Sequence, residues 1–134
     1  MSDATKTPRI DMMRSPLGRA RGSGAARSGA HHWWAQRLTA VALVPLTLWF
    51  VWSLILLTGA GQAAMVDWLS APHRLALMLA LIGATFHHLI LGLQVVIEDY
   101  VRADGQRVAA LLAMKGVCVL CALMCVASVL KLGL

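Results

Sequence analysis

Three long apolar runs, separated by short polar segments, dominate the chain from residue 38 onwards. They cover residues 38–57, about 75–97 and about 108–130. Each run has roughly the 20 residues that a helix rising about 1.5 Å per residue needs to cross ~30 Å of hydrocarbon. Only helices and closed barrels satisfy their backbone groups in lipid, and runs this long are helical. The pattern therefore predicts an all-α membrane protein, a bundle of three helices.

The segments between the runs have the composition of turns. TGAGQ follows the first run and RADGQR follows the second, and Gly, Asp and Asn are typical of turns. Pro45 lies inside the first run, where it either kinks the helix or occupies one of its early turns. We expect residues 31–134 to form the membrane domain, preceded by a separate tail over residues 1–30.

Composition and charge support a membrane location and suggest an orientation. Apolar residues make up 59% of the chain and charged residues 13%, far from the soluble average. Seven of the twelve Lys and Arg residues lie at or before Arg37, and Arg102 and Arg107 lie between the second and third runs. Basic segments stay on the inner side of a membrane, so we predict an N-terminus on the cytoplasmic or matrix side.

The basic tail itself is rich in Arg, Gly, Ser and Ala, and we expect it to be mobile. Its low acid content is also typical of an organelle transit peptide, so an organellar origin stays open. A nucleic-acid-binding tail is the less simple interpretation of the same charges, and we expect no nucleic-acid partner.

Three cysteines lie in the last apolar run. Cys118, Cys121 and Cys125 follow i, i+3, i+7 spacing and share one helix face. A metal site would need a fourth ligand and a turn around the ion, whereas this segment is one rigid helix. We therefore expect buried thiols that pack as small hydrophobic groups.

Two adjacent histidines, His87 and His88, lie deep in the second run. His88 is eleven residues before Asp99, about three helical turns plus ~20°, so the two share a face ~16 Å apart along the axis. Ala84 lies one turn before His88 and Gly92 one turn after it. This face therefore places an imidazole between small residues and ends in an acid at the inner surface.

Small residues beside an imidazole let a flat macrocycle approach, so His88 could be an axial ligand of a haem iron. A hydrogen bond to another helix or a proton path would explain an intramembrane histidine equally well. His87 points ~100° away, with Gly83 one turn before it, and the pattern also permits it as the ligand. We favour His88 because its face continues to Asp99.

Three further residues at the ends of the runs could carry chemistry. Asp99 and Tyr100 could hydrogen-bond a quinone carbonyl and supply protons, or form a solvated helix end with Tyr100 in the interfacial belt. Arg37 could anchor to lipid phosphate, pair with a propionate or polarise a quinone oxygen.

Taken together, these features resemble the hydrophobic, D-type membrane anchor subunit of bacterial succinate dehydrogenase, respiratory complex II. The match rests on the motif Arg37-Leu38-Thr39-Ala40 and on a histidine followed by Gly at +4 and Asp-Tyr at +11 and +12, here His88, Gly92, Asp99 and Tyr100. The three-helix layout adds to it. The similarity covers roughly residues 31 to 130.

The resemblance implies a specific role. Anchors of this family pair with a cytochrome-b-type anchor subunit, hold haem b between them with one axial histidine each, and dock the iron–sulfur and flavoprotein subunits. Electrons from succinate then reach ubiquinone, which links the tricarboxylic acid cycle to electron transport. By position, His88 resembles the haem iron ligand, Gly92 its small neighbour and Arg37 the arginine near the propionates and quinone. Tyr100 resembles the quinone-site tyrosine, with Asp99 beside it.

Two other classes of function compete with this interpretation. A small proton-coupled transporter subunit would use His87, His88 and Asp99 as a relay, but Asp99 falls at the interface rather than at mid-membrane. A structural assembly protein would leave the Ala84–His88–Gly92 face unexplained. The chain has no flavin or iron–sulfur motif of its own, so we expect it to take no direct part in succinate oxidation.

Overall fold

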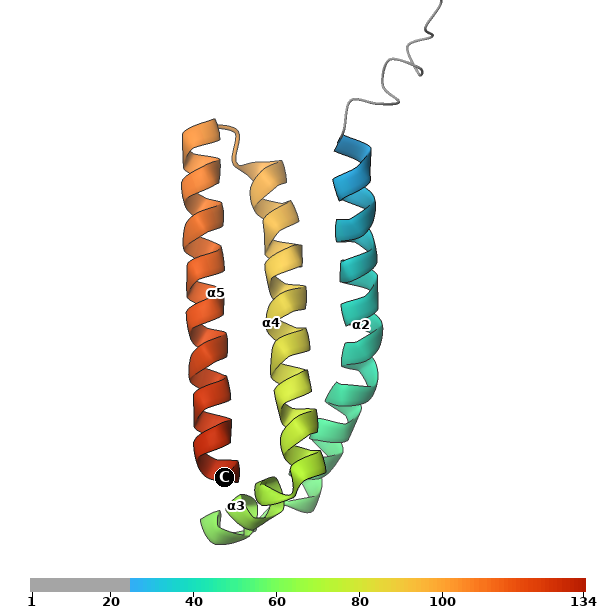
Figure 1. Cartoon of the computed structure of the whole chain (residues 1–134), viewed down its shortest axis with the longest axis vertical. Helices are drawn as coiled ribbons and strands as arrows, with labels where there is room; N and C mark the ends of the chain where they lie inside the picture. Colours follow the sequence, from blue (N-terminus) through green and yellow to red (C-terminus); the bar gives the residue numbers. More distant parts are fainter. Residues whose placement is uncertain (1–24) are drawn as a thin grey trace, which may run out of the picture. The chain divides into compact units, whose positions relative to one another are not determined.

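Helices make up nearly all of the part of the chain that the structure, a computed structural model, describes (residues 25–134, with side chains from residue 29). They are α2 (Ala25–Leu56), α3 (Gln62–Ser70), α4 (Pro72–Tyr100) and α5 (Asp104–Gly133) (Figure 1). Over this part, α2, α4 and α5 are long and apolar enough to cross a membrane. The predicted all-α class with three membrane helices is confirmed.

The long helices extend beyond the apolar runs from which they were predicted. α2 begins at Ala25, thirteen residues before the first run, and α4 and α5 are each longer than expected at both ends. An apolar run marks only the part of a helix that contacts lipid, whereas backbone hydrogen bonds continue through polar residues in water. Residues 25–30, expected in the mobile tail, are helical, and residues 1–24 of that tail lie outside the described part.

The two predicted turns are formed differently. After α2, Gly59 adopts a left-handed backbone with φ of 82°, which glycine tolerates without a steric penalty, and TGAGQ is a turn as expected. Only residues 101–103 separate α4 from α5, so most of RADGQR is helical. Asp104 is in the first turn of α5, where a carboxylate interacts favourably with the helix dipole. It also forms an ion pair with Arg107 at 2.6 Å. Pro45 lies within an α2 that is continuous through it.

The short helix α3 was not predicted, because its nine residues are too few to produce an apolar run of membrane length. Trp68 on α3 stacks on Trp49 of α2, with ring centroids 5.9 Å apart. The Arg74 guanidinium lies 5.2 Å from the Trp68 ring centroid and donates a hydrogen bond to the Trp68 carbonyl at 3.0 Å. α3 thus joins the end of α2 to the start of α4.

The helices of residues 32–134, which form one unit, pack unequally. The backbones of α4 and α5 run close together (Figure 1), and α3 lies against both. By contrast, α2 contacts α4 through side chains, including the hydrogen bond between Thr39 and His88. At one close approach, a Cβ added to Gly133 would lie 2.8 Å from Leu75 Cδ1 and 3.5 Å from Leu69. Small residues of this kind let membrane helices come together.

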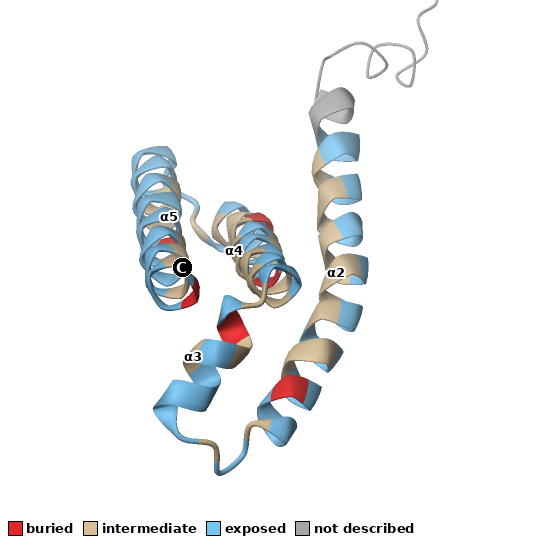
Figure 2. Ribbon diagram, turned by 60° about the horizontal axis from the view of Figure 1, so that its bottom comes forward, coloured by how far each residue is buried: buried red, intermediate tan, exposed pale blue. Residues whose placement is uncertain are grey.

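Few side chains are buried within the chain. Among the described residues the buried apolar ones are Leu69, Leu81, Leu91 and Cys118, and Figure 2 shows exposed and half-buried positions over most of each helix. Cys121 and Cys125 are exposed, so the prediction of buried thiols holds for Cys118 alone. The three cysteines share a helix face by spacing but not the same degree of burial. So much exposed apolar surface is expected of helices that meet lipid or another protein.

Candidate functional site

His88 lies between α4 and α2, where two side chains of α2 contact its ring. Its Nδ1 atom is 2.9 Å from the hydroxyl oxygen of Thr39, and its Nε2 atom is 3.3 Å from the amide nitrogen of Gln36. The imidazole is half-buried. Both ring nitrogens are therefore engaged from one face of α2, by residues three positions apart.

The hydrogen-bond network assigns one tautomer to the His88 ring. The Thr39 hydroxyl donates its proton to the backbone carbonyl of Ala35 at 2.8 Å, and the carbonyl of Gln36 lies 3.0 Å away. The Thr39 hydroxyl oxygen can therefore accept a hydrogen bond from Nδ1–H of His88. An amide nitrogen can only donate, so Nε2 must accept from Gln36. His88 is thus protonated on Nδ1 and carries its lone pair on Nε2.

Small residues flank this imidazole, as the sequence predicted. Ala84 and Gly92, one turn to either side, are half-buried, and a Cβ added to Gly92 would lie 3.6 Å from the Gln36 amide nitrogen. The residues of the predicted common face differ in exposure, since Asp99 is exposed whereas His88 and Gly92 are half-buried. His87 is exposed as well, so the two adjacent histidines differ in their surroundings.

Arg37 belongs to the same turn of α2 but points elsewhere. It is exposed, and its guanidinium lies 5.1 Å from the ring centroid of Trp33. Trp33 in turn meets Trp34 edge-to-face, with centroids 5.1 Å apart. Gln36, the residue before Arg37, contacts His88. No hydrogen bond joins Arg37 itself to His88 in the described part.

Asp99 and Tyr100, the last two residues of α4, lie at a distance from His88. Both are exposed, Tyr100 by 82%. Eleven residues of helix separate Asp99 from His88, a rise of about 16 Å. Among the described side chains, no hydrogen bond joins either residue to Arg37 or His88. The structure thus gathers His88 and Gly92 around Gln36 and leaves Asp99 and Tyr100 as a separate polar end.

Sequence reasoning missed Gln36 and Thr39 as parts of the site. Thr39 was noted only as a member of the Arg-Leu-Thr-Ala motif. The available signal was their i, i+3 spacing at the start of an apolar run, which places two hydrogen-bonding side chains on one helix face. Two buried atoms near them have no partner in the described part, His32 Nε2 and Gln36 Oε1.

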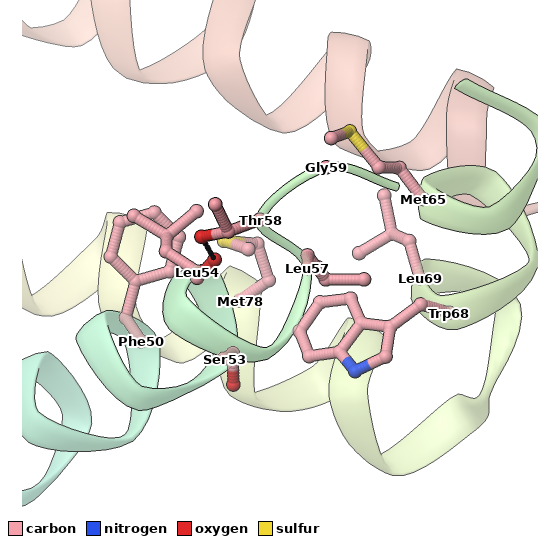
Figure 3. A pocket seen from close by; sticks show the side chains of 10 residues that line it. All are labelled: Phe50, Ser53, Leu54, Leu57, Thr58, Gly59, Met65, Trp68, Leu69 and Met78. Atoms are coloured by element: carbon pink, nitrogen blue, oxygen red, sulfur yellow. Dashed lines mark hydrogen bonds between the residues drawn. The ribbon is translucent and has the colours of Figure 1, made fainter. Parts of the chain in front are cut away.

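An apolar cavity of about 310 Å³ lies away from this site, where the end of α2, α3 and the start of α4 meet (Figure 3). Its walls include Phe50, Trp68 and Met78, and Met78 is ten residues before His88 on α4. No predicted site residue lines it.

The residues around His88 fit an axial ligand position for a haem. One imidazole has its lone pair on Nε2, its other nitrogen is held by a hydroxyl, and the neighbouring turns carry small residues. The described residues contain no group of three or more His, Cys, Asp or Glu that could hold a bare ion. Two further buried polar atoms of α2, Gln36 Oε1 and His32 Nε2, lack hydrogen-bond partners in the described part.

Three apolar helices and an intramembrane imidazole bonded between two of them define a multi-pass membrane protein with a candidate cofactor site. The chain belongs to the family of succinate dehydrogenase/fumarate reductase transmembrane subunits, whose family model matches residues 11–124. The match confirms the resemblance found in the sequence, and it favours an anchor subunit over the transporter alternative.

Individual relatives agree with the family. The chain is 33% identical over 102 residues to the succinate dehydrogenase hydrophobic membrane anchor subunit of Rickettsia bellii, covering 76% of this chain and 82% of that protein. It is 30% identical over 98 residues to the protein of the same name from Paracoccus denitrificans, covering 73% and 75%. No solved structure matches the chain significantly.

Proposed function

We propose that this chain, as a succinate dehydrogenase membrane anchor, helps to pass electrons from succinate to ubiquinone. In this role it docks an iron–sulfur and a flavoprotein subunit and pairs with a cytochrome-b-type anchor subunit. The protein lies in a bacterial inner membrane with its N-terminus on the cytoplasmic side. Arg102 and Arg107 at the α4–α5 connection support this orientation, because basic residues favour the inner side. The names of the relatives and the three apolar helices support this assignment.

His88 is the proposed axial ligand of a haem b shared with the second anchor subunit. The observation that carries this proposal is the state of the ring: Nδ1–H is bonded to Thr39 while the Nε2 lone pair points away from that bond. Haem b, when bound, supplies one-electron storage between donor and acceptor. The partner anchor subunit would supply the second ligand to the iron.

Gly92 and Arg37 complete the proposed cofactor site. Gly92 leaves room beside His88 because it carries no side chain. Arg37 supplies a fixed positive charge and planar N–H donors suited to a carboxylate such as a haem propionate. Its stacking on Trp33 holds the guanidinium at the level of the Gln36–Thr39 turn.

Asp99 and Tyr100 are the proposed quinone-binding residues. A phenol at the helix end can donate a hydrogen bond to a quinone carbonyl, and an adjacent carboxylate in contact with water can relay protons. Their exposure in the chain by itself leaves both groups free for such a ligand.

The partner anchor subunit would also cover the exposed apolar surface of the chain. Large side chains such as Leu38, Trp52 and Leu112 are more than half exposed. Lipid contacts part of this surface, and a second helical subunit can bury the part that faces the cofactor.

The test is the reduced-minus-oxidised visible spectrum of the purified complex carrying His88→Leu. The proposal expects the b-type α-band to vanish while succinate oxidation with an artificial acceptor persists, which shows that the other subunits are assembled. An unchanged α-band would overturn the assignment.

A further inference from the structure

We propose that Thr39 and Gln36 are positioning residues that act on His88 in opposite directions. Thr39 holds the ring in the tautomer that can ligate a metal, and Gln36 occupies the ligating nitrogen until the metal takes its place. This inference rests on the proposed haem role of His88, and the experiment below separates the two.

The argument for Thr39 rests on its hydrogen bonds. Its hydroxyl proton is committed to the α2 backbone, with carbonyl oxygens at 2.8 and 3.0 Å, so the oxygen can only accept from His88. At 2.9 Å the Nδ1–H bond fixes both the tautomer and the rotation of the imidazole. A hydrogen bond at this nitrogen also makes the opposite nitrogen a stronger electron donor.

The argument for Gln36 rests on the contrast between the two halves of its amide. Its nitrogen lies 3.3 Å from His88 Nε2, a longer contact than that of Thr39, while its oxygen is buried without a partner. The Nε2 lone pair cannot accept from Gln36 and bind iron at the same time. Gln36 therefore competes with a metal for His88.

A neighbour on α2 offers Gln36 an alternative partner. His32 lies four residues earlier, on the same helix face, and its Nε2 atom is also buried and unpartnered within the described part. Side-chain rotation would let the Gln36 amide oxygen accept from His32 Nε2–H. Release of His88 would thus pair the Gln36 oxygen with His32 Nε2, the two buried atoms that lack partners within the described part.

The two residues therefore predict effects of different sign. Thr39→Val keeps the side-chain shape but removes the acceptor, so haem should be held about 10- to 100-fold less tightly. The imidazole also becomes a weaker donor to ferric iron, and the reduction potential should rise. Gln36→Leu removes a competitor, so haem should be held at least as tightly as in the wild type.

The experiment uses the complete complex, purified from membranes with wild-type, Thr39→Val, Thr39→Ser, Gln36→Leu or His88→Leu chains. Haem loss to excess apomyoglobin and the midpoint potential of the α-band are measured. We expect faster loss and a raised potential for Thr39→Val, restoration of both by Thr39→Ser, and loss from Gln36→Leu no faster than from the wild type.

The outcomes distinguish the two proposals. If Thr39→Val matches the wild type while His88→Leu lacks the α-band, the role of Thr39 is wrong and the haem assignment stands. Faster haem loss from Gln36→Leu would overturn competition by Gln36. A normal α-band in His88→Leu would overturn the haem assignment, and this inference with it.

Discussion

The Nδ1 atom of His88 lies 2.9 Å from the Thr39 hydroxyl oxygen, a hydrogen bond between residues 49 positions apart that ties α4 to α2. The backbones of α2 and α4 do not pack closely. Side-chain contacts such as this one therefore determine which turn of α2 lies opposite which turn of α4. The bond places His88 beside the turn of α2 that carries Gln36 and Arg37.

Gly92→Ala should reduce haem retention without harming the chain. A Cβ at residue 92 meets Gln36 only at ordinary contact distance, 3.6 Å, and alanine favours the helix. Against a bound ring, however, overpacking costs about 1–3 kcal/mol, which weakens binding about 5- to 150-fold. The haem-to-flavin ratio of purified complexes measures this. Gly83→Ala, with nothing within 4 Å of the added Cβ, is the matched control, and equal ratios would contradict the prediction.

Tyr100→Phe should slow quinone reduction about tenfold, the effect of losing one hydrogen bond of ~1.5 kcal/mol. Tyr100 is 82% exposed, so its hydroxyl contributes little to folding of the chain. Steady-state assays with a ubiquinone analogue and with an artificial acceptor separate the two activities. Glu98→Gln, one turn after its hydrogen-bond partner Gln94, should leave both rates near wild type. Undiminished quinone reduction in Tyr100→Phe would count against this site.

Arg37→Gln should lower the haem midpoint potential, because removal of a nearby positive charge favours the oxidised, more positive iron. A tenfold change in the equilibrium corresponds to about 59 mV for one electron, and we expect a shift of roughly this size. Arg37→Lys keeps the charge and should shift the potential much less. Redox titration of the α-band measures both variants. A wild-type potential in Arg37→Gln would place the charge away from the cofactor. The sign is opposite to that expected for Thr39→Val.

Gly133→Val should destabilise the packing of α5 against α3 and α4. A Cβ at this position would lie 2.8 Å from Leu75 Cδ1, the movable end of a side chain, and 3.5 Å from the Leu69 side chain and carbonyl oxygen. The two methyl groups of valine have to fit into the same space, and overpacking costs about 1–3 kcal/mol. Gly116→Val, on the same helix with open space around it, controls for helix propensity. Unfolding of the purified complex in increasing dodecyl sulfate should begin earlier for Gly133→Val alone, and coincident curves would refute the predicted clash.

The helices were predictable from the sequence, and their ends were not. Apolar runs report contact with lipid, so they located three membrane helices. They carry no information on the polar turns that extend α2 back to Ala25. The nine-residue α3 was missed for the same reason, since its packing of Trp68 on Trp49 depends on tertiary contacts.

The candidate site was predictable only in part. Spacing along one helix identified His88 and Gly92, because helical periodicity orders residues within a helix. The contacts that Gln36 and Thr39 make with His88 depend on which turns of α2 and α4 lie opposite each other. The periodicity of a single helix does not specify this. The same limit applies to Cys121 and Cys125, whose shared face with Cys118 did not imply a shared burial.

The central claim is that His88, and not its neighbour His87, binds a haem iron. Reduced-minus-oxidised spectra of complexes carrying His88→Leu or His87→Leu test it most directly, because the variants make the same change at adjacent positions. His87 is exposed, whereas His88 is half-buried with its ring held by Thr39. We predict that the b-type α-band disappears in His88→Leu and survives in His87→Leu. Loss of the band in His87→Leu alone, or a colourless wild-type complex with full quinone reductase activity, would contradict the claim.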